Sequence, residues 1–585
     1  MSKKLLALAL ASVAGLVPGV AAADPNDAYG PPPEGIAPAG SSWDVPGAII
    51  VDGQDSLSSD ELDALLADVS ARFPGVSFSA TDFDDDTRIK LARVAPGAAA
   101  AVIDAFDDDG RLENIEPLSW VRAEFVPNDP LYKDQWHMKR AGAETAWDYG
   151  TGVGVTVAVI DTGIACEDYQ GFMKGTDLAN TRCVGGWNLI WDNEHANDDH
   201  GHGTHVAGTI AQTTDNAVGV TGLAFGSRLM PVKVLDKRGW GTNLDVANGI
   251  RWAADNGAQV INLSLGGPQN SKVLQDAVKH ARDLGVVVVA SAGNSGGSVG
   301  YPGGSEGVIG VSASDQGDKL ASFSSRGPGV DIAAPGVDVV QQTICQEGKN
   351  KCEIYASWRG TSMASPHVAA AAALLVGAGV TDPEDIERRL EESARVVDPT
   401  DNGKRLFGSG ILDAGAALRK VAFDYGLARL GFLLGLTALV TLWARKAAGA
   451  GAAGPKGLGF WVAGLATGPG LLFFAPLVLS RTMLPVDILA RPIADLDLYV
   501  GAGLHRLLPL ATAAVPFALM LVGYQSRVLR QIAAGAGVGT AAYLASLLFF
   551  REAWAPFGGA LFLGWCAVNA AASLLIARTC LAETK

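Results

Sequence analysis

Residues 157–163 read Val-Ala-Val-Ile-Asp-Thr-Gly, so a short apolar run ends in a carboxylate and a turn. A strand that is apolar throughout is typical of a parallel sheet covered on both faces. The run at 155–160 is followed by others at 229–235, 260–265, 286–290 and 308–311, with helical stretches that begin at Thr242 and Ser271 between them. This alternation predicts a three-layer α/β domain with a parallel sheet over residues 127–422.

The overall composition excludes several classes of protein. The 585 residues carry a formal net charge of −16, which argues against a nucleic-acid partner, because the phosphate backbone attracts basic proteins. Hydrophobic residues make up 48% of the chain and charged residues only 18%, so a single soluble globule is not expected. Six cysteines in so long a chain do not support a scaffold built from disulfides.

The N-terminus has the features of a secretory signal peptide. Lys3 and Lys4 precede an apolar stretch, residues 5–20, which ends in three alanines before Asp24. We therefore expect a signal peptide over 1–23. A retained anchor is the alternative, although the apolar stretch is short for a membrane span. Residues 24–44, rich in proline and glycine, are expected to form a linker.

Residues 45–126 are predicted to form a small α+β unit. Short strands are expected near 48–51, 76–79, 89–94 and 115–121. A first helix, capped by Ser58 or Ser59, has the apolar face Leu62, Leu65, Leu66 and Val69, and a second helix is expected over 98–106. The order β-α-β-β-α-β is the ferredoxin-like, split βαβ arrangement.

Long apolar stretches dominate residues 423–585. Five of them, at 427–443, 458–479, 507–524, 532–550 and 557–577, have about the length that crosses a bilayer as a helix. We therefore expect an all-α transmembrane region of about five helices. Lys and Arg near the span ends modestly favour the cytoplasm for 445–456, 527–530 and 578–585, which puts the preceding domain on the extracytoplasmic side.

Three local motifs carry candidate chemistry. Asp161 follows the first strand, His202 opens a helix in His-Gly-Thr-His, and Ser362 lies in Gly-Thr-Ser-Met-Ala-Ser-Pro before an alanine-rich helix. Each alone is ordinary: a turn aspartate, a polar helix end or an N-cap. Together they supply what serine nucleophilic catalysis needs, which is a hydroxyl, an imidazole base and a carboxylate that orients the imidazole and stabilises its charge.

Such catalysis also needs hydrogen-bond donors for the negative charge that develops on the substrate carbonyl. The segment 291–296, Ser-Ala-Gly-Asn-Ser-Gly, follows an apolar strand and offers the side-chain amide of Asn294. The backbone N–H of Ser362, at a helix N-terminus, is the expected second donor, and the helix dipole acts in the same sense.

These motifs, in the order Asp, His, Ser, resemble the subtilisin-like serine proteases, and thermitase-like members in particular, over about residues 128–421. The resemblance implies Asp161 as the orienting carboxylate, His202 as general base and acid, Ser362 as nucleophile and Asn294 as oxyanion donor. His200 and His205 are the alternatives to His202, which is preferred because it opens the His-Gly-Thr-His motif.

The resemblance also implies how a peptide is held. One strand of the cleft is expected at Ser264, Leu265 and Gly266, a second at Gly239, Trp240 and Gly241, and the far wall and floor at Gly293 and Gly300. A glycine floor without an acidic residue leaves room for a large apolar or aromatic side chain and gives no preference for Arg or Lys. Pairing with the substrate backbone as an added strand demands little of its sequence.

A structural calcium ion is implied by the thermitase-like resemblance, with Asp129, Asp177 and Asn216 as ligands. Carboxylate, amide and backbone carbonyl oxygens together suit Ca²⁺. A solvated acidic loop is the alternative.

The same resemblance assigns residues 45–126 as an inhibitory propeptide that folds against the enzyme, with processing near 120–128. A permanent accessory domain is the alternative. The cysteines agree with export, because Cys166 with Cys183 and Cys345 with Cys352 lie in loops and can pair in an oxidising compartment. Cys566 and Cys580, in the last apolar stretch, are expected to remain thiols.

Together these features predict a multi-pass membrane protein with an extracytoplasmic serine endopeptidase domain, matured from a zymogen and acting on polypeptides. A binding protein that has lost catalysis is a weaker alternative, since all four catalytic positions carry the required residue types. Another alternative is a protease that regulates a multi-span sensor or transporter. Asn569 and the pair His505–Arg506 are its only polar support.

Overall fold

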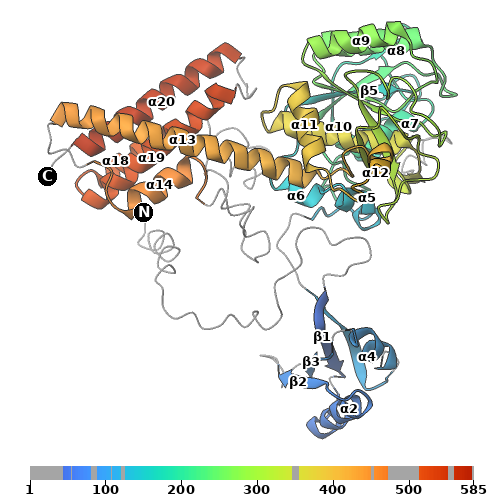
Figure 1. The fold of residues 1–585 in the computed structure, drawn as a ribbon, viewed down its shortest axis with the longest axis horizontal. Helices are drawn as coiled ribbons and strands as arrows, with labels where there is room; N and C mark the ends of the chain where they lie inside the picture. The colour runs from blue at the N-terminus through green and yellow to red at the C-terminus, as the bar shows by residue number, and fades with distance from the viewer. Residues whose placement is uncertain are drawn as a thin grey trace. The chain divides into compact units, whose positions relative to one another are not determined.

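The computed structural model describes residues 44–119, 126–344, 355–448, 454–471, 513–550 and 559–582, apart from 55, 81–87, 96 and 107–108. The predicted signal peptide, almost all of the predicted linker and most of the predicted processing region lie outside these residues. Contacts divide the described chain into two compact units, residues 44–119 and residues 126–582 (Figure 1).

The first unit has the expected element order β-α-β-β-α-β. Its elements are β1 (Asp44–Gly53), α2 (Ser59–Arg72), β2 (Ser77–Ala80), β3 (Ile89–Arg93), α4 (Ala99–Phe106) and β4 (Leu112–Ser119). The strands form an antiparallel sheet in the order β2-β3-β1-β4, and Ser58 caps α2. Leu65 of α2 and Phe106 of α4 bury in one cluster with Ile49 of β1, so the unit has a core of its own.

A parallel sheet organises the second unit, as the apolar runs predict. Its strands are β5 (Thr156–Asp161), β6 (Arg182–Cys183), β7 (Trp187–Asn188), β8 (Arg228–Lys233), β9 (Val260–Leu263), β10 (Val287–Ser291), β11 (Ile309–Ser314) and β12 (Ile332–Pro335). They lie in the order β12-β11-β10-β9-β5-β8-β6, with β7 also on β8, and every pairing is parallel. The sequence pattern does not predict β6, β7 or β12, because β6 and β7 are only two residues long and β12 ends in Pro335, a residue that is unusual in central strands.

Helices cover both faces of this sheet. Along β5, Val157 and Val159 face one core while Ala158 and Ile160 face the other, which is the period of a strand buried on both sides. Helices α8 (Asn243–Asp255) and α9 (Lys272–Asp283), which begin after Thr242 and Ser271 as predicted, pack on one face. Helices α7 (His202–Ala211) and α10 (Thr361–Gly377) pack on the other.

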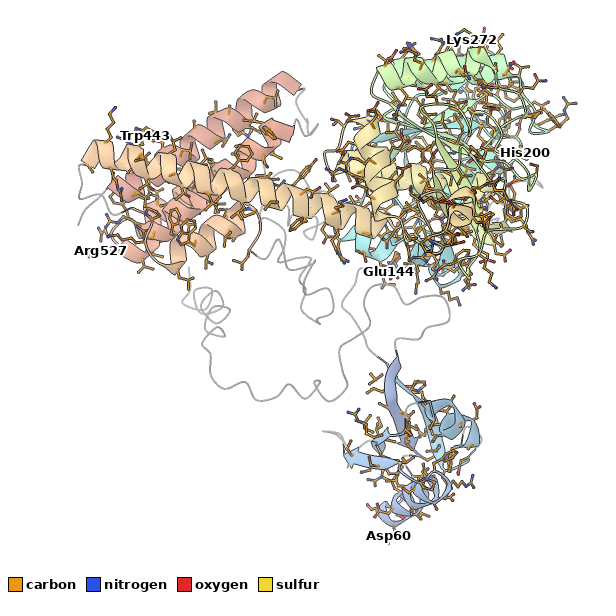
Figure 2. All side chains as sticks on the ribbon, viewed as in Figure 1. Asp60, Glu144, His200, Lys272, Trp443 and Arg527 are labelled. Atoms are coloured by element: carbon orange, nitrogen blue, oxygen red, sulfur yellow. A yellow bond between two sulfur atoms is a disulfide. The ribbon has the colours of Figure 1, made fainter. Side chains whose placement is uncertain are left out.

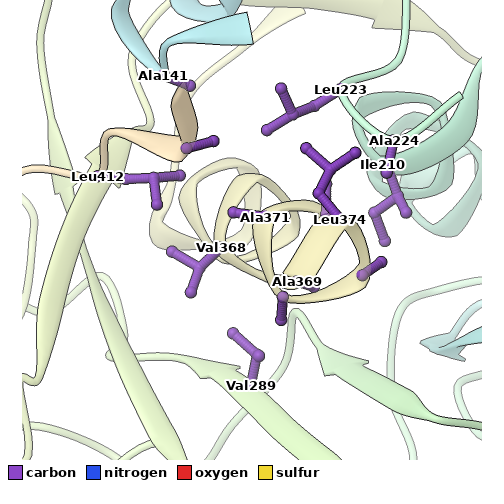
Figure 3. Close-up of a cluster of buried hydrophobic side chains, with 14 of the residues drawn as sticks. Ala141, Ile210, Leu223, Ala224, Val289, Val368, Ala369, Ala371, Leu374 and Leu412 are labelled. Atoms are coloured by element: carbon purple, nitrogen blue, oxygen red, sulfur yellow. The ribbon is translucent and has the colours of Figure 1, made fainter. Parts of the chain in front are cut away.

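Helix α10 is buried along nearly its whole length. Figure 3 shows its Val368 and Leu374 among side chains from the surrounding elements, including Ile210 of α7 and Val289 of β10. Burial of one such Val or Leu side chain stabilises the fold by about 1.5–3 kcal/mol. This packing fixes the start of α10, where Ser362 lies.

Shorter elements complete the α/β domain. They are η2 (Tyr132–Asp134), α5 (Trp136–Arg140), α6 (Ala143–Trp147), η3 (Thr176–Leu178), the antiparallel pair β13 (Val339–Gln342) and β14 (Tyr355–Trp358), α11 (Pro383–Ser393) and α12 (Asp401–Phe407).

One helix, α13 (Ala414–Ala448), belongs to both the α/β domain and a C-terminal helical bundle. Its first turns contribute to the core of the α/β domain through Leu418, Val421 and Tyr425. Asp424 pairs with Arg389 of α11 at 2.9 Å. Little more than one turn later, Arg429 is buried in the bundle, where its Nε donates to Oγ of Ser546 at 3.0 Å.

The bundle contains α13, α14 (Leu458–Thr467), α18 (Ala514–Gly523), α19 (Arg527–Phe550) and α20 (Gly559–Ala582). Three of these helices, α13, α19 and α20, are long and apolar enough to cross a membrane. The prediction of one continuous helix over 458–479 is wrong, because α14 ends at Thr467 where Gly-Pro-Gly follows. Residues 472–512, which include the end of the second predicted span and the start of the third, lie outside the described residues.

Candidate active site

The predicted chemical groups lie at the carboxyl ends of the sheet strands, where open α/β sheets bind their ligands. Asp161 is the last residue of β5, His202 the first residue of α7, and Ser362 the second residue of α10. Asn294 lies in the loop that follows β10. The fold therefore gathers segments that are far apart in the sequence at one edge of the sheet.

Asp161 and His202 make the most direct contact of this site. Nδ1 of His202 lies 2.7 Å from Oδ1 of Asp161, whose side chain is 0% exposed. Gly203 permits the close approach, since a Cβ on it would lie 2.1 Å from the carbonyl oxygen of Gly163 and 3.2 Å from Cβ of Asp161. The carboxylate favours the tautomer with its proton on Nδ1, which leaves Nε2 of His202 as the basic nitrogen.

Nearby charges favour the protonated form of His202. Burial of the ring opposes its charge, but the Asp161 carboxylate, with a smaller contribution from Asp198, outweighs burial and raises the pKa of His202. The alternative base His205 instead bonds the carbonyl oxygen of Ala356 at 3.0 Å, and burial lowers its pKa to about 3. These contacts favour His202 over His205 as a base.

Ser362 is docked on Ser264, the residue that follows β9. The hydroxyl of Ser362 donates to the carbonyl oxygen of Ser264 at 3.1 Å, and Oγ of Ser264 donates to the carbonyl oxygen of Ser362 at 2.8 Å. The candidate nucleophile therefore lies against the segment that is expected to pair with a substrate.

The amide of Asn294 has a fixed orientation. Its Oδ1 accepts both the N–H of Thr361 at 2.9 Å and the hydroxyl of Thr361 at 3.0 Å, so its amino group points the other way. A Cβ on Gly360, whose φ is 152°, would lie 3.5 Å from Nδ2 of Asn294 and 3.6 Å from the backbone N of Ser362. Both predicted oxyanion donors therefore border the same space beside Gly360.

Most residues expected to line the cleft lie close to one another. Gly267 and Tyr301 exchange backbone hydrogen bonds of 2.8 Å, which join the segment 264–267 to the segment that starts at Gly300. Gly293 lies against the same segment, since a Cβ on it would be 3.9 Å from the backbone N of Gly300. Ser264, Leu265, Gly266, Gly293 and Gly300 thus form one continuous region.

Gly239, Trp240 and Gly241, which the resemblance implies as a strand beside a bound peptide, form a turn in the structure. The N–H of Asp236 donates to the carbonyl oxygen of Trp240 at 2.8 Å and closes a turn, on which the Trp240 side chain is 75% exposed. The segment 239–241 can become a strand only by pairing with a bound peptide, so in the chain alone it forms a turn. His200 is next to this turn, since a Cβ on Gly239 would lie 3.5 Å from its Nε2.

Trp358 lies at the site, but no motif in the sequence predicts that position. Its ring stacks on two histidines of α7, with centroids 6.3 Å from His202 and 4.6 Å from His205 and interplanar angles of 22° and 6°. The pairing of β14 with β13 sets its position, and no local motif indicates that pairing.

The three predicted calcium ligands form two neighbouring contacts. Asp177 accepts Nδ2 of Asn216 at 2.9 Å, and Asp129 accepts the N–H of Asp215 at 2.7 Å. Burial raises the pKa of Asp177 to about 6 and also raises that of Asp129. In the described part of the chain, the buried Oδ1 of Asp129 has no hydrogen-bond partner. The unpartnered oxygen of Asp129 fits a site that a cation completes, whereas both oxygens of Asp177 already accept hydrogen bonds, from Asn216 and from the N–H of Val220.

The described cysteines agree with the prediction where it can be examined. Cys166 and Cys183 form a disulfide between the loop after β5 and strand β6. Cys345 and Cys352 lie outside the described residues. Cys566 and Cys580 are buried in the helical bundle.

A parallel-sheet α/β domain that gathers an Asp–His pair, a serine at a helix start and an asparagine at one sheet edge has the make-up of a serine protease. Comparison with known proteins defines the family within this class. The model of the subtilase family matches residues 152–410. The chain belongs to the subtilase family of serine proteases.

Three relatives illustrate this similarity. The chain is 36% identical over 405 residues to the thermophilic serine proteinase of Bacillus sp. (strain AK1), an alignment that covers 68% of this chain and 95% of the relative. It is 40% identical to thermitase of Thermoactinomyces vulgaris, over 47% of this chain and 94% of thermitase. It is 43% identical to subtilisin Savinase of Lederbergia lenta, over 48% of this chain and 98% of the relative.

Proposed function

We propose that the chain is a membrane-anchored serine endopeptidase that hydrolyses peptide bonds with Asp161, His202 and Ser362. The observation that carries this proposal is the 2.7 Å contact between Nδ1 of His202 and Oδ1 of Asp161, at the sheet edge where α10 presents Ser362. A binding protein without catalysis is disfavoured, because every residue type that the chemistry needs is present.

In the proposed reaction, Ser362 turns its hydroxyl from Ser264 towards His202 and attacks the carbonyl carbon of the substrate. Nε2 of His202 takes the hydroxyl proton, and Asp161 stabilises the imidazolium that forms. The negative charge on the substrate oxygen is received by Nδ2 of Asn294 and the N–H of Ser362.

Collapse of this intermediate breaks the peptide bond and leaves an acyl-enzyme. His202 returns its proton to the leaving amine, and a water molecule, deprotonated by the same nitrogen, then hydrolyses the ester. The product acid leaves, and Ser362 regains its hydroxyl proton.

The proposed substrates are polypeptides in extended conformation. The segment 264–266 and the turn at 239–241 flank the site, and both would pair with a substrate backbone as neighbouring strands. Gly293 and Gly300 leave space for a large apolar or aromatic side chain before the scissile bond, and the exposed Trp240 offers a further apolar surface.

Maturation from a zymogen is part of the proposal. Residues 45–126 would act as an intramolecular inhibitor, and cleavage would occur near 120–128. The separate core of residues 44–119 supports this role, because a propeptide must fold independently and leave as a unit. The alignment with the thermophilic serine proteinase, which extends well beyond residues 152–410, is consistent with it.

We also propose that the bundle is a multi-pass anchor and that the protease domain is extracytoplasmic. Cationic residues gather at one end of the bundle. Arg578 of α20 lies 4.6 Å from the ring of Trp443 on α13, and Nε2 of Gln531, beside Arg530, donates to the carbonyl of Gly454 at 3.0 Å. Figure 2 shows Trp443 and Arg527 towards this end. Positively charged ends face the cytoplasm.

The structure gives Asn569, one polar support of the alternative sensor or transporter, a hydrogen-bond partner within its own helix. Asn569 donates its Nδ2 to the carbonyl oxygen of Trp565, one turn earlier in its own helix, at 2.9 Å. This local bond favours a structural role for Asn569, so anchoring is the simpler role for the bundle.

Calcium is proposed as a structural ion held by Asp129, Asp177 and Asn216. When bound, the ion supplies the positive charge that these buried carboxylates lack. The rest of the chain, not the ion, performs the proposed chemistry.

An active-site probe tests the proposed function. A fluorophosphonate should label the purified, matured protein, and Ser362→Ala should abolish both labelling and hydrolysis of a protein substrate such as casein. Ser365→Ala, which changes a buried serine of the same helix that bonds Asn262, is the matched control. Labelling of Ser362→Ala, or wild-type protein that neither takes up the probe nor cuts casein, would refute the proposal.

A further inference from the structure

Asp198 provides a second buried carboxylate close enough to His202 to act on its charge. Asp198 is only 3% exposed and precedes His202 by four residues. Its Oδ1 accepts the hydroxyl of Thr162 and the N–H groups of His200 and Gly201, each at 2.9 Å. These contacts hold the backbone that leads directly into α7.

The other oxygen of Asp198 holds the first turn of α7. Its Oδ2 accepts the N–H of Thr204 at 2.9 Å and the hydroxyl of Thr204 at 2.6 Å. All five partners of the Asp198 side chain are donors, so the surroundings are made for an ionised carboxylate. A negative charge at the N-terminus of a helix is also favoured by the helix dipole.

The two threonine hydroxyls extend this network to the strand that carries Asp161. Oγ1 of Thr162, the residue after Asp161, accepts the N–H of Gly203 at 2.9 Å. Oγ1 of Thr204 accepts the N–H of Ala165, in the loop after β5, at 3.0 Å. Asp198 therefore joins the end of β5, which carries Asp161, to the start of α7, which carries His202.

The charged and titratable groups around His202 come from several elements. Asp161 faces it from β5 and Asp198 from the loop before α7. The ring centroid of His200 lies 6.2 Å from that of His202. His205 lies one turn later on α7, where burial, with a smaller contribution from His202, lowers its own pKa to about 3. Trp358 of β14 covers the ring without adding charge. The two carboxylates are thus the groups that favour the imidazolium.

We propose that Asp198 is a positioning residue for the hydrolysis. It keeps Asp161 and His202 aligned by binding both of the segments that carry them, and it places a second negative charge behind the imidazolium that forms during the reaction. This inference rests on the proposed endopeptidase function.

Asp198→Asn tests the inference, because it keeps the side-chain shape but removes the charge and replaces one acceptor by a donor. With the full-length protein in detergent, turnover per fluorophosphonate-labelled site should fall by roughly 10–100-fold, as for loss of an oriented base. The acidic limb of the kcat/KM profile should move to lower pH by about half a unit or more, since one carboxylate no longer favours the imidazolium. Glu194→Gln, which removes the same charge from an exposed position in the same loop, should change neither quantity.

A purely structural role would lower the amount of labelled protein but leave its turnover and its pH profile unchanged, and that result would overturn the inference.

If Asp198→Asn does not mature, Thr162→Val provides the second test, because it removes the hydrogen bond between the end of β5 and the Asp198 carboxylate while keeping the charge of Asp198. The turnover of Thr162→Val per labelled site should fall several-fold, while the acidic limb of its kcat/KM profile should stay at the wild-type pH. Unchanged turnover would refute the positioning role. Failure of the proposed function itself would be visible in the wild type, which would then neither label nor hydrolyse peptide.

Discussion

Thr361 donates both its backbone N–H and its hydroxyl to Oδ1 of Asn294, at 2.9 Å and 3.0 Å. This double contact orients the amide of Asn294, so that Nδ2 and the N–H of Ser362 border the same space. A donor held in place before the substrate arrives needs no reorganisation during the reaction, which is why such donors are effective.

Asn294→Ala should therefore lower kcat by about 10²–10³-fold with little change in KM, because the lost interaction is made mainly in the transition state. Steady-state kinetics on a chromogenic peptide would measure both constants. Ser295→Ala alters the neighbouring side chain, which pairs with Ser325, and serves as control. Equal kcat for Asn294→Ala and wild type would exclude Asn294 as an oxyanion donor.

The activity should depend on pH through His202. A general base must be neutral, so kcat/KM should be low below the pKa of His202 and rise as pH increases through it. Because Asp161 raises that pKa, the acidic limb should lie above the usual histidine value of about 6.5. Asp161→Asn should move the limb to lower pH and reduce kcat by about 10⁴-fold. A limb that stays in place in this variant would contradict the assignment of His202 as base.

Removal of calcium should destabilise the protein. An ion bound only to the native state adds RT ln(1 + [L]/Kd) to the free energy of unfolding, which is about 2.7 kcal/mol at a hundredfold excess over Kd. The melting temperature of wild type should fall in excess EDTA and recover on addition of Ca²⁺. Asp177→Asn should remove most of this difference, whereas Asp192→Asn, on an exposed loop, should retain it. A melting temperature unaffected by EDTA would rule out the site.

Glu391 of α11 should destabilise the protein at neutral pH. Burial, together with the nearby carboxylates of Glu387 and Asp331, raises the pKa of Glu391 to about 7. In the native state the group therefore binds a proton that the unfolded chain releases near pH 4.5, so stability should decrease as pH rises from about 4.5 to 7. Glu391→Gln should stabilise the protein by roughly 1 kcal/mol at pH 8, since the side chain is partly exposed, and by much less at pH 4.5.

Thermal unfolding at the two pH values would measure this effect. Glu384→Gln, an exposed change on the same helix, should give no comparable gain. A Glu391→Gln variant that gains the same stability at both pH values would show that its effect is not linked to this proton.

The bundle should be dispensable for hydrolysis of a soluble peptide if it is an anchor. The core of the α/β domain includes Leu418, Val421 and Tyr425 of α13, so truncation after Gly426 should leave kcat/KM unchanged. Truncation after Asp413 should instead lower the melting temperature strongly, because each of these side chains contributes about 1.5–3 kcal/mol by burial. Loss of peptide hydrolysis in a folded protein truncated after Gly426 would favour a functional role for the bundle.

The sequence predicts those parts of the fold that depend on local pattern. Strand β5 is recognisable because burial on both faces requires an uninterrupted apolar run, and α8 because Thr242 and Asp245 form a capping box before an apolar periodicity. The motifs of the candidate active site are equally local, so Asp161, His202 and Ser362 can be named as candidates from the sequence alone.

Other features depend on contacts that no local pattern encodes. Trp358 reaches His202 only through the pairing of β14 with β13. Asp198 is one of several acidic residues in its loop, and only the fold shows that its carboxylate is buried while Glu194 is exposed. The strand at 239–241 is implied by the family resemblance and pairs with a bound peptide, so the chain alone shows a turn there.

Helix α13 passes from its ion pair with Arg389 to its buried contact with Ser546 in little more than one turn. Between these two contacts α13 is one continuous helix, so a sharp bend there would break backbone hydrogen bonds of the helix. If the bundle is embedded in a lipid bilayer as proposed, the protease domain that shares α13 with it would diffuse laterally with the membrane. It would then meet only those polypeptides that come close to the membrane surface.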